Sequence, residues 1–411
     1  MIRKGLLLSI ALLVGLAAVS PAHAHKDMGE WAEKVKQMER MWVLDGTGIH
    51  NVGNLQMHVT NWGCFGSYPS STWPTNEFPS AQWPANSGVE FLYIAGLWVG
   101  AKKGGIPVVS TGAYEIEFRP SSDPVQKIYT SFEGAPGGSR LPSPADDDKD
   151  GVADEDWLNG MDDDGDGKFD EDFAAIGKQM FSCWYTDDDP TATQVNPEHT
   201  PLHLFVRQES YQWEEEQFYN FVGIEYKIRN YGTENIEDLY IGFFADGDAG
   251  RRDREQYWMD DATGLWEGIV CAKKGEREVP IRISIAYFYD KDGDEGQATG
   301  YLGILFLGHD TDPLGDNAPQ MVGITSYQNF SGDQPYENGG DPGNDFQRYE
   351  LMSKGLKDRD AEVPRDYRMM MAVGPFLELP PDSQTVLQVA FAAGEGLPGM
   401  LEAAASAALA Y

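Results

Sequence analysis

Two adjacent acidic segments, 146–157 and 162–173, hold the residues whose types and spacing could do chemistry. In each segment aspartates stand at positions 1, 3 and 5, and a glycine stands at position 6. Alternate carboxylates on a short turn can converge on one hard cation, and the glycine permits the bend. The spacing therefore predicts two calcium sites. The predicted ligands are Asp146, Asp148, Asp150, Asp154 and Glu155 in the first segment, and Asp162, Asp164, Asp166, Asp170 and Glu171 in the second.

Position 12 of both segments is aromatic, with Trp157 in the first and Phe173 in the second. An EF-hand has a bidentate glutamate there and helices on either side, so these loops are not EF-hands. They resemble the Asp-rich loops of thrombospondin type 3 repeats in their D-x-D-x-D-G-x-x-D core, without the asparagine-cysteine that follows it. Acids at positions 9 to 11 must then complete the ligand shell. We expect the aromatic side chains to pack the loops onto a neighbouring sheet.

Charge supports cation binding in this region. Residues 146–172 hold twelve Asp and two Glu against two Lys, in a chain whose formal net charge is −35. Carboxylates crowded in this way repel one another unless bound cations offset the repulsion. A solvated acidic linker is the alternative, but it gives no reason for the glycine spacing to repeat. A surface this acidic also excludes nucleic acid as a partner.

A third acidic turn contains Asp290, Asp292 and Asp294 and lies between two predicted strands. It keeps the D-x-D-x-D spacing but has no glycine at position 6, so a plain polar hairpin turn is the alternative. Asp246 and Asp248, at the end of another predicted strand, could supply ligands to the same ion.

The first residues have the pattern of a signal peptide. A basic start is followed by an apolar run and by Ala22-His23-Ala24, which predicts cleavage after Ala24. No other stretch approaches about twenty apolar residues, so we expect no membrane span. The mature protein is expected to be secreted or held at the cell surface, with the periplasm as a further possibility.

The rest of the chain predicts a mainly β protein. Apolar residues alternate with polar ones between Gly, Pro and Asn turns, which favours an antiparallel β-sandwich-type architecture with the acidic segment as an insertion and short helices at the ends. Ile224 to Ile228 and Leu239 to Phe243 have the pattern of a hairpin. The expected organisation is a signal peptide (1–24), an N-terminal helix and first β region (25–133), the acidic segment (134–176), and a second β region with a C-terminal helix (177–411). Other predicted strands cover 55–62, 91–99, 281–289, 300–307, 367–373 and 385–392, with a helix over 26–42 and a long loop over 309–349.

Cysteine and histidine give weaker signals. Cys64, Cys183 and Cys271 are an odd number at wide spacing, which allows one disulfide or none, and we assign them mainly to packing. His199 and His203 have the spacing of a helical metal site. Pro197 before them and Pro201 between them make a helix improbable. They are interpreted as loop histidines.

Several stretches together resemble a largely uncharacterised family of exported bacterial β-rich proteins with Asp-rich calcium loops. The matching stretches are 91–100, the acidic 160–173, 241–248, 373–376, 380–383 and 394–396. The resemblance covers most of the mature chain. It implies export and a β-rich body, and it supplies no activity.

Three functions compete at this point. The first is a secreted calcium-binding structural or adhesive protein without catalytic activity, whose partner would be a cell-surface glycan or an extracellular protein. The second is a carbohydrate-binding surface protein that uses exposed tryptophans such as Trp73 and Trp83 as sugar platforms. The third is a secreted hydrolase, in which the carboxylates after Trp213 would be the candidate catalytic groups of a glycosidase-type site.

Overall fold

The structure is a computed structural model that describes residues 46–66, 78–120, 128–132, 138–140, 158–159, 167, 170, 173–361 and 363–411. The predicted signal peptide, the predicted helix over 26–42 and the tryptophans Trp73 and Trp157 lie outside these residues. So do the predicted ligands of the two acidic segments, with the exception of Asp170.

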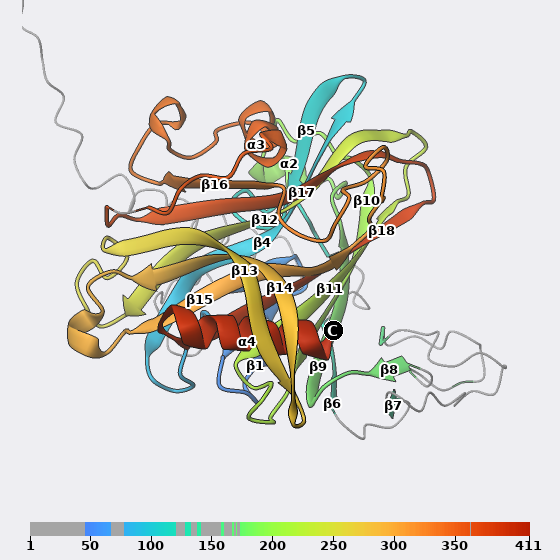
Figure 1. The fold of residues 1–411 in the computed structure, drawn as a ribbon. Helices are drawn as coiled ribbons and strands as arrows, with labels where there is room; N and C mark the ends of the chain where they lie inside the picture. Colours follow the sequence, from blue (N-terminus) through green and yellow to red (C-terminus); the bar gives the residue numbers. More distant parts are fainter. Residues whose placement is uncertain are drawn as a thin grey trace, which may run out of the picture.

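Two antiparallel eight-stranded sheets form the body (Figure 1). The first sheet has the order β1-β2-β3-β4-β12-β17-β16, with β5 paired to β4, and the second has the order β13-β14-β15-β18-β11-β10-β9-β6. The first sheet comprises β1 (Thr47–His50), β2 (Met57–Thr60), β3 (Cys64–Gly66), β4 (Val89–Lys103), β5 (Ile106–Thr111), β12 (Ile236–Arg251), β16 (Ser326–Ser331) and β17 (Tyr367–Leu379). The second comprises β6 (Tyr129–Phe132), β9 (Gln179–Thr186), β10 (Leu204–Gln212), β11 (Phe221–Asn230), β13 (Asp261–Lys274), β14 (Arg277–Asp290), β15 (Gly300–His309) and β18 (Gln384–Glu395).

The described residues form few other elements. A small parallel pair joins β7 (Gly138–Arg140) to β8 (Phe173–Ala175). The helices are α2 (Ala192–Val195), α3 (Asp345–Ser353) and α4 (Gly396–Ala410), with short 3₁₀ turns η1 (Asp294–Gly296) and η2 (Tyr336–Asn338). None of the helices in the described ranges is long and apolar enough to cross a membrane.

The mainly β, antiparallel sandwich-type architecture is confirmed. In β11 the alternation has the expected effect, because Ile224, Tyr226 and Ile228 are buried while Arg229 is exposed. β4 pairs with β12, and β6 pairs with β9. Strands from 25–133 and from 177–411 therefore share both sheets, and the predicted boundaries at 133 and 177 do not separate one sheet from the other.

The predicted hairpin between β11 and β12 is wrong. β11 pairs with β10 and β18 in the second sheet, whereas β12 pairs with β4 and β17 in the first. The turn after β11 instead carries the chain from one sheet to the other. The Asn230 side-chain amide donates hydrogen bonds to the carbonyl oxygens of Glu234 and Leu379 and fixes this crossing. Alternation of apolar residues is the same for a hairpin and for two strands in facing sheets.

The main core lies between the two sheets. It joins Phe65 and Phe243 of the first sheet to Tyr226 and Phe391 of the second, and all four side chains are buried. A second apolar cluster covers the outer face of the first sheet, where Trp98 stacks on Phe244 with ring centroids 5.1 Å apart. Burial on both sides explains why β4 and the second half of β12 are almost wholly buried.

Among the residues that the structure describes, α4 covers the outer face of the second sheet and α3 covers part of the outer face of the first (Figure 1). α4 packs Met400, Ala404 and Ala407 onto the second sheet, which confirms the predicted C-terminal helix. α3 packs Tyr349 and Met352 onto the first sheet. The interpretation of 309–349 as one long loop is therefore wrong in part, because this stretch contains β16 and the start of α3. Both elements are short, and β16 is rich in polar residues, so neither has a strong apolar period.

The three cysteines are free. Cys64 and Cys183 are buried and Cys271 is exposed, so the packing role is confirmed for the first two. His199 and His203 lie in a loop before β10, as predicted.

Candidate metal centre

Three buried aspartates meet at the end of the first sheet. Asp246 and Asp248 lie on β12, and Asp366 immediately precedes β17, which pairs with β12. One carboxylate oxygen from each of the three lies within 4.8 Å of the others. We call these three residues the inner cluster. Its members are each at most 4% exposed, so solvent does not screen their mutual repulsion.

Arg368 is the cation that pairs with these carboxylates, and the charge of Arg252 also acts on Asp248. It lies directly opposite Asp246 in the β12–β17 register, and its Nε donates to Asp246 Oδ2 at 2.8 Å. Its Nη1 donates to Asp341 Oδ2 at 2.7 Å, and its Nη2 lies 3.8 Å from Asp366 Oδ2. Gly332 leaves room for the guanidinium, because a Cβ there would overlap it. One arginine is thus shared among three carboxylates, which leaves the region negatively charged.

The inner cluster has unused ligand capacity. Asp246 Oδ1 is buried without a hydrogen-bond partner. Burial raises the pKa of Asp246, and Arg368 only partly reverses that effect. Burial also raises the pKa of Asp248 well above its usual range, and the charges of Asp246 and Asp366 raise it further. Each of these buried carboxylates must therefore either bind a proton and become neutral or lie beside a cation that offsets its charge.

A second group of acids, the outer cluster, lies where β13 begins and β14 ends. Carboxylate oxygens of Asp260, Asp290 and Asp292 lie within 4.8 Å of one another. Asp290 Oδ1 accepts hydrogen bonds from the backbone N–H groups of Asp292 at 3.0 Å and Gly293 at 2.8 Å, which shapes the turn. Gly293 has φ 74°, a conformation that suits glycine. Asp260 Oδ1 is buried without a hydrogen-bond partner.

The structure thus divides the five aspartates that were predicted to share one ion. Asp246 and Asp248 belong to the inner cluster, and Asp290 and Asp292 belong to the outer cluster. The fifth, Asp294, is in neither, and its Oδ2 instead accepts a hydrogen bond from the Arg251 backbone at 3.0 Å. Asp261 links the two clusters. It follows Asp260 of the outer cluster in the chain, and both its carboxylate oxygens accept hydrogen bonds at 3.1 Å from the backbone N–H of Ala249, which follows Asp248 of the inner cluster.

The two clusters include residues that the sequence did not indicate. Asp366 and Asp260 each stand just before a strand, but nothing in the local spacing marks them as ligands. The pairing of β17 with β12, and of β13 with β14, brings them to the predicted aspartates. Only the sheet topology could have identified them.

Few residues of the two acidic segments lie within the described part of the chain. Gly167, at position 6 of the second segment, has φ 94° and is exposed. Asp170 accepts a hydrogen bond on Oδ1 from the Asn159 backbone at 2.7 Å. Phe173 is buried against Leu158, Met180 and Tyr211. The expected packing of this aromatic side chain onto a neighbouring sheet is therefore confirmed for Phe173, since Met180 lies on β9 and Tyr211 on β10.

Trp83 is not an exposed sugar platform. Its side chain is 8% exposed, and its Nε1 donates to Asn220 Oδ1 at 3.0 Å. The interpretation was wrong because Trp83 packs into the core between the sheets. The carboxylates that follow Trp213 are exposed on a turn, where Glu214 pairs with Lys178 at 3.0 Å.

The donor set of both clusters suits a hard cation. Every candidate ligand atom is a carboxylate oxygen, the type that Ca²⁺ and Mg²⁺ prefer. Calcium accepts six to eight oxygens in flexible geometry, whereas magnesium requires near-ideal octahedral geometry, and irregular clusters on strand ends fit the first better. The buried, unpartnered oxygens of Asp246 and Asp260 are what a bound cation would satisfy.

Without divalent ions, stability should fall as pH rises. Burial and the charges of Asp260, Asp294 and Asp292 raise the pKa of Asp290 to about 7. The folded state thus binds this proton more tightly than the unfolded state, whose pKa is about 3.9. The stabilisation is complete below about pH 4 and is lost as pH rises through about 7. Urea unfolding in metal-free buffer from pH 4 to pH 8 would measure this loss.

Asp290→Asn tests whether Asp290 causes this loss of stability with rising pH, because asparagine keeps the acceptor oxygen but does not titrate. The variant should lose stability less steeply than the parent over the same pH range. Identical pH profiles for the two proteins would contradict the assignment.

Comparisons with known proteins do not place the chain in a family. No protein-family model and no curated protein matches it. Among solved structures, it is similar to the crystal structure of the Slr1438 protein from Synechocystis sp. PCC 6803. That match covers 54% of this chain and 63% of that chain, at 10% sequence identity and a TM-score of 0.25. A TM-score this low carries no argument about fold or function.

Proposed function

We propose that the protein is an exported, calcium-binding structural or adhesive protein without catalytic activity. The observation that carries the proposal is the inner cluster, in which three buried carboxylates meet and Asp246 Oδ1 has no partner. Asp246 and Asp248 lie on β12, and Asp366 immediately precedes β17, which pairs with β12, so an ion bound there would clamp the first sheet. The outer cluster would do the same at the β13–β14 end of the second sheet.

The magnitude expected from calcium favours a structural role. A site with a dissociation constant of about 10 μM, at the millimolar calcium outside cells, stabilises the folded state by roughly 2.7 kcal/mol. That is a large fraction of the stability of an ordinary domain. The repeated acidic segments at 146–172 would add further ions, and export would place all of the sites where calcium is abundant. A glycan array would separate an adhesive role toward sugars from one toward proteins.

Asp248→Asn should have opposite effects with and without calcium. In a chelator the variant should be more stable than the parent, because one of three mutually repelling buried carboxylates is neutral. In millimolar calcium it should be less stable than the parent, because the site has lost a charged ligand. Calorimetric midpoints in both conditions would show the crossover.

Asp316→Asn is the matched control, because Asp316 is exposed and lies in neither cluster. It should leave both midpoints unchanged. Asp148→Ala or Asp164→Ala would separate the contribution of the acidic segments from that of the two clusters. A parent midpoint that does not respond to calcium at physiological salt would overturn the proposed function.

A further inference from the structure

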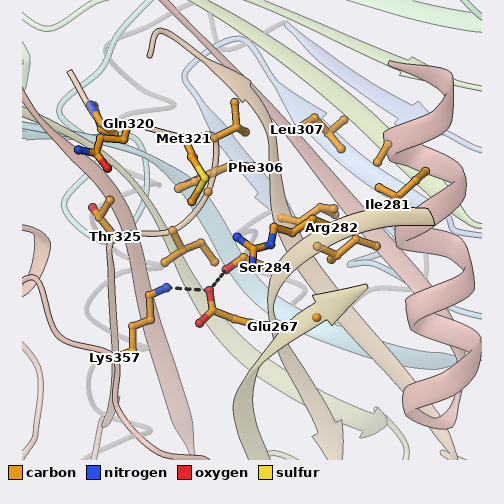
Figure 2. Close-up of a pocket in the computed structure, with 18 of the residues that line it drawn as sticks. Glu267, Ile281, Arg282, Ser284, Phe306, Leu307, Gln320, Met321, Thr325 and Lys357 are labelled. Atoms are coloured by element: carbon orange, nitrogen blue, oxygen red, sulfur yellow. Dashed lines mark hydrogen bonds and ion pairs between the residues drawn. The ribbon is translucent and has the colours of Figure 1, made fainter. Parts of the chain in front are cut away.

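A groove of about 810 Å³ opens between β14 and β15, away from the aspartate clusters (Figure 2). The two strands pair only where residues 285–289 of β14 face residues 301–305 of β15. Beyond that point β14 continues to Arg277 and β15 continues to His309, but no pair joins them. Residues 319–325 and the end of α4 close the sides of the groove.

The unpaired part of β14 presents hydrogen-bonding groups to the groove. On β13 the Leu265 N–H donates to Asp360 and the Thr263 C=O accepts from the Ala361 N–H, so both residues turn their backbone groups away from β14. Their partners Ala286 and Phe288, and with them the other even-numbered residues of β14, therefore direct their backbone N–H and C=O groups toward β15. Arg282 and Ser284 therefore turn these groups toward the opening. The ladder to β15 ends at the Ile285–Leu305 pair, and beyond it no described residue pairs with the backbone groups that Arg282 turns to this side. An open strand edge of this kind is a template for the addition of another strand.

The side chains around the opening suit an extended apolar segment. Phe306 and Ile324 are buried in the floor of the groove. Met321 is 63% exposed and Val322 is 45% exposed on its rim, which is unusual for large apolar side chains. Alternate side chains of an added strand would cover these apolar surfaces.

The groove carries excess positive charge in a strongly acidic protein. Lys357 Nζ pairs with Glu267 at 2.7 Å, and Ser284 donates to the same carboxylate at 2.9 Å. Arg282 is exposed and forms no ion pair with any described residue. Figure 2 shows its guanidinium directed into the groove near Ser284. A guanidinium in this position is suited to bind a carboxylate through two parallel hydrogen bonds.

We propose that this groove binds an extended peptide segment of another protein as an added strand on β14, with a carboxylate of the peptide on Arg282. The apolar side chains of the peptide cover Phe306 and Met321. The carboxylate belongs either to an acidic side chain or to a peptide C-terminus. The proposal concerns a different face from the aspartate clusters and does not depend on calcium binding.

Three fluorescein-labelled peptides test the proposal on the full mature protein in calcium. Gly-Ser-Val-Thr-Val-Val has a free C-terminus, Gly-Ser-Val-Glu-Val-Val is amidated, and Gly-Ser-Val-Gln-Val-Val is amidated and neutral. Fluorescence polarisation should show at least one carboxylate peptide binding about tenfold more tightly than the neutral peptide. The carboxylate peptide that binds more tightly shows whether the groove takes a C-terminal carboxylate or an acidic side chain. N-methylation of alternate backbone amides should abolish its binding, because an added strand needs them.

Arg282→Gln should reduce the affinity for the tighter peptide about tenfold and leave the neutral peptide unchanged. Arg277→Gln is the matched control on the same strand outside the groove, and it should change nothing. An unchanged thermal midpoint would show that Arg282→Gln is folded. The proposal is overturned if no peptide binds up to about 1 mM, if Arg282→Gln has no effect, or if the N-methylated peptide binds equally well. Binding of an oligogalacturonate instead of the peptides, with the same dependence on Arg282, would also overturn it.

Discussion

Arg368→Met should destabilise the protein by about 3–5 kcal/mol in a chelator, the cost of removing one partner from a buried ion pair. Arg368 is 4% exposed and donates to both Asp246 and Asp341, with Asp366 nearby. Methionine fills part of the volume but supplies no charge, so the three carboxylates would lose the cation that they share. Urea unfolding followed by tryptophan fluorescence would measure the loss.

Calcium should partly rescue this variant. A divalent cation in the inner cluster would supply positive charge at the place where the guanidinium was lost, so the destabilisation in millimolar calcium should be smaller than in chelator. Arg229→Met is the control, because Arg229 is 51% exposed in its pair with Asp382 and should contribute little. If Arg368→Met cost less than about 1 kcal/mol, protons on the carboxylates would be balancing the charge instead of Arg368.

The strand content could be predicted because each strand carries its own local signal. In β11 the buried and exposed faces follow the alternation of residues 224–229, and in α4 the alanine-rich run forms a helix. Pairing between strands has no such local signal. β11 and β12 are neighbours in the chain but lie in different sheets, whereas β4 and β12 pair although more than a hundred residues separate them.

The same limit explains what was missed in the candidate metal centre. Asp246 and Asp248 could be named because their spacing places two carboxylates close together on one short segment. Asp366 and Arg368 belong to the same region only because β17 lies beside β12, and Arg368 is 122 residues from Asp246. Spacing along the chain detects ligands that one turn supplies, and it does not detect ligands that two strands supply.

The two sheets share one core, so loss of a single central side chain should weaken both together. Phe243 of the first sheet is fully buried, and its ring centroid lies 5.5 Å from Phe391 and 6.4 Å from Tyr226, both in the second sheet. Phe65 lies 6.1 Å away in the first sheet. Phe243→Ala should therefore cost about 3–5 kcal/mol, because it removes apolar contacts and leaves a cavity that rigid strands cannot close.

Unfolding of the Phe243→Ala variant should remain a single transition, with circular dichroism and tryptophan fluorescence giving the same midpoint. Phe346→Ala is the matched control, because Phe346 is 65% exposed on α3 and its removal should change stability by less than about 0.5 kcal/mol. Two separate transitions, with only one sensitive to Phe243→Ala, would show instead that the sheets unfold independently. A single shifted transition would show that the two sheets unfold as one unit, because the same core connects β12 to the strands next to the outer cluster.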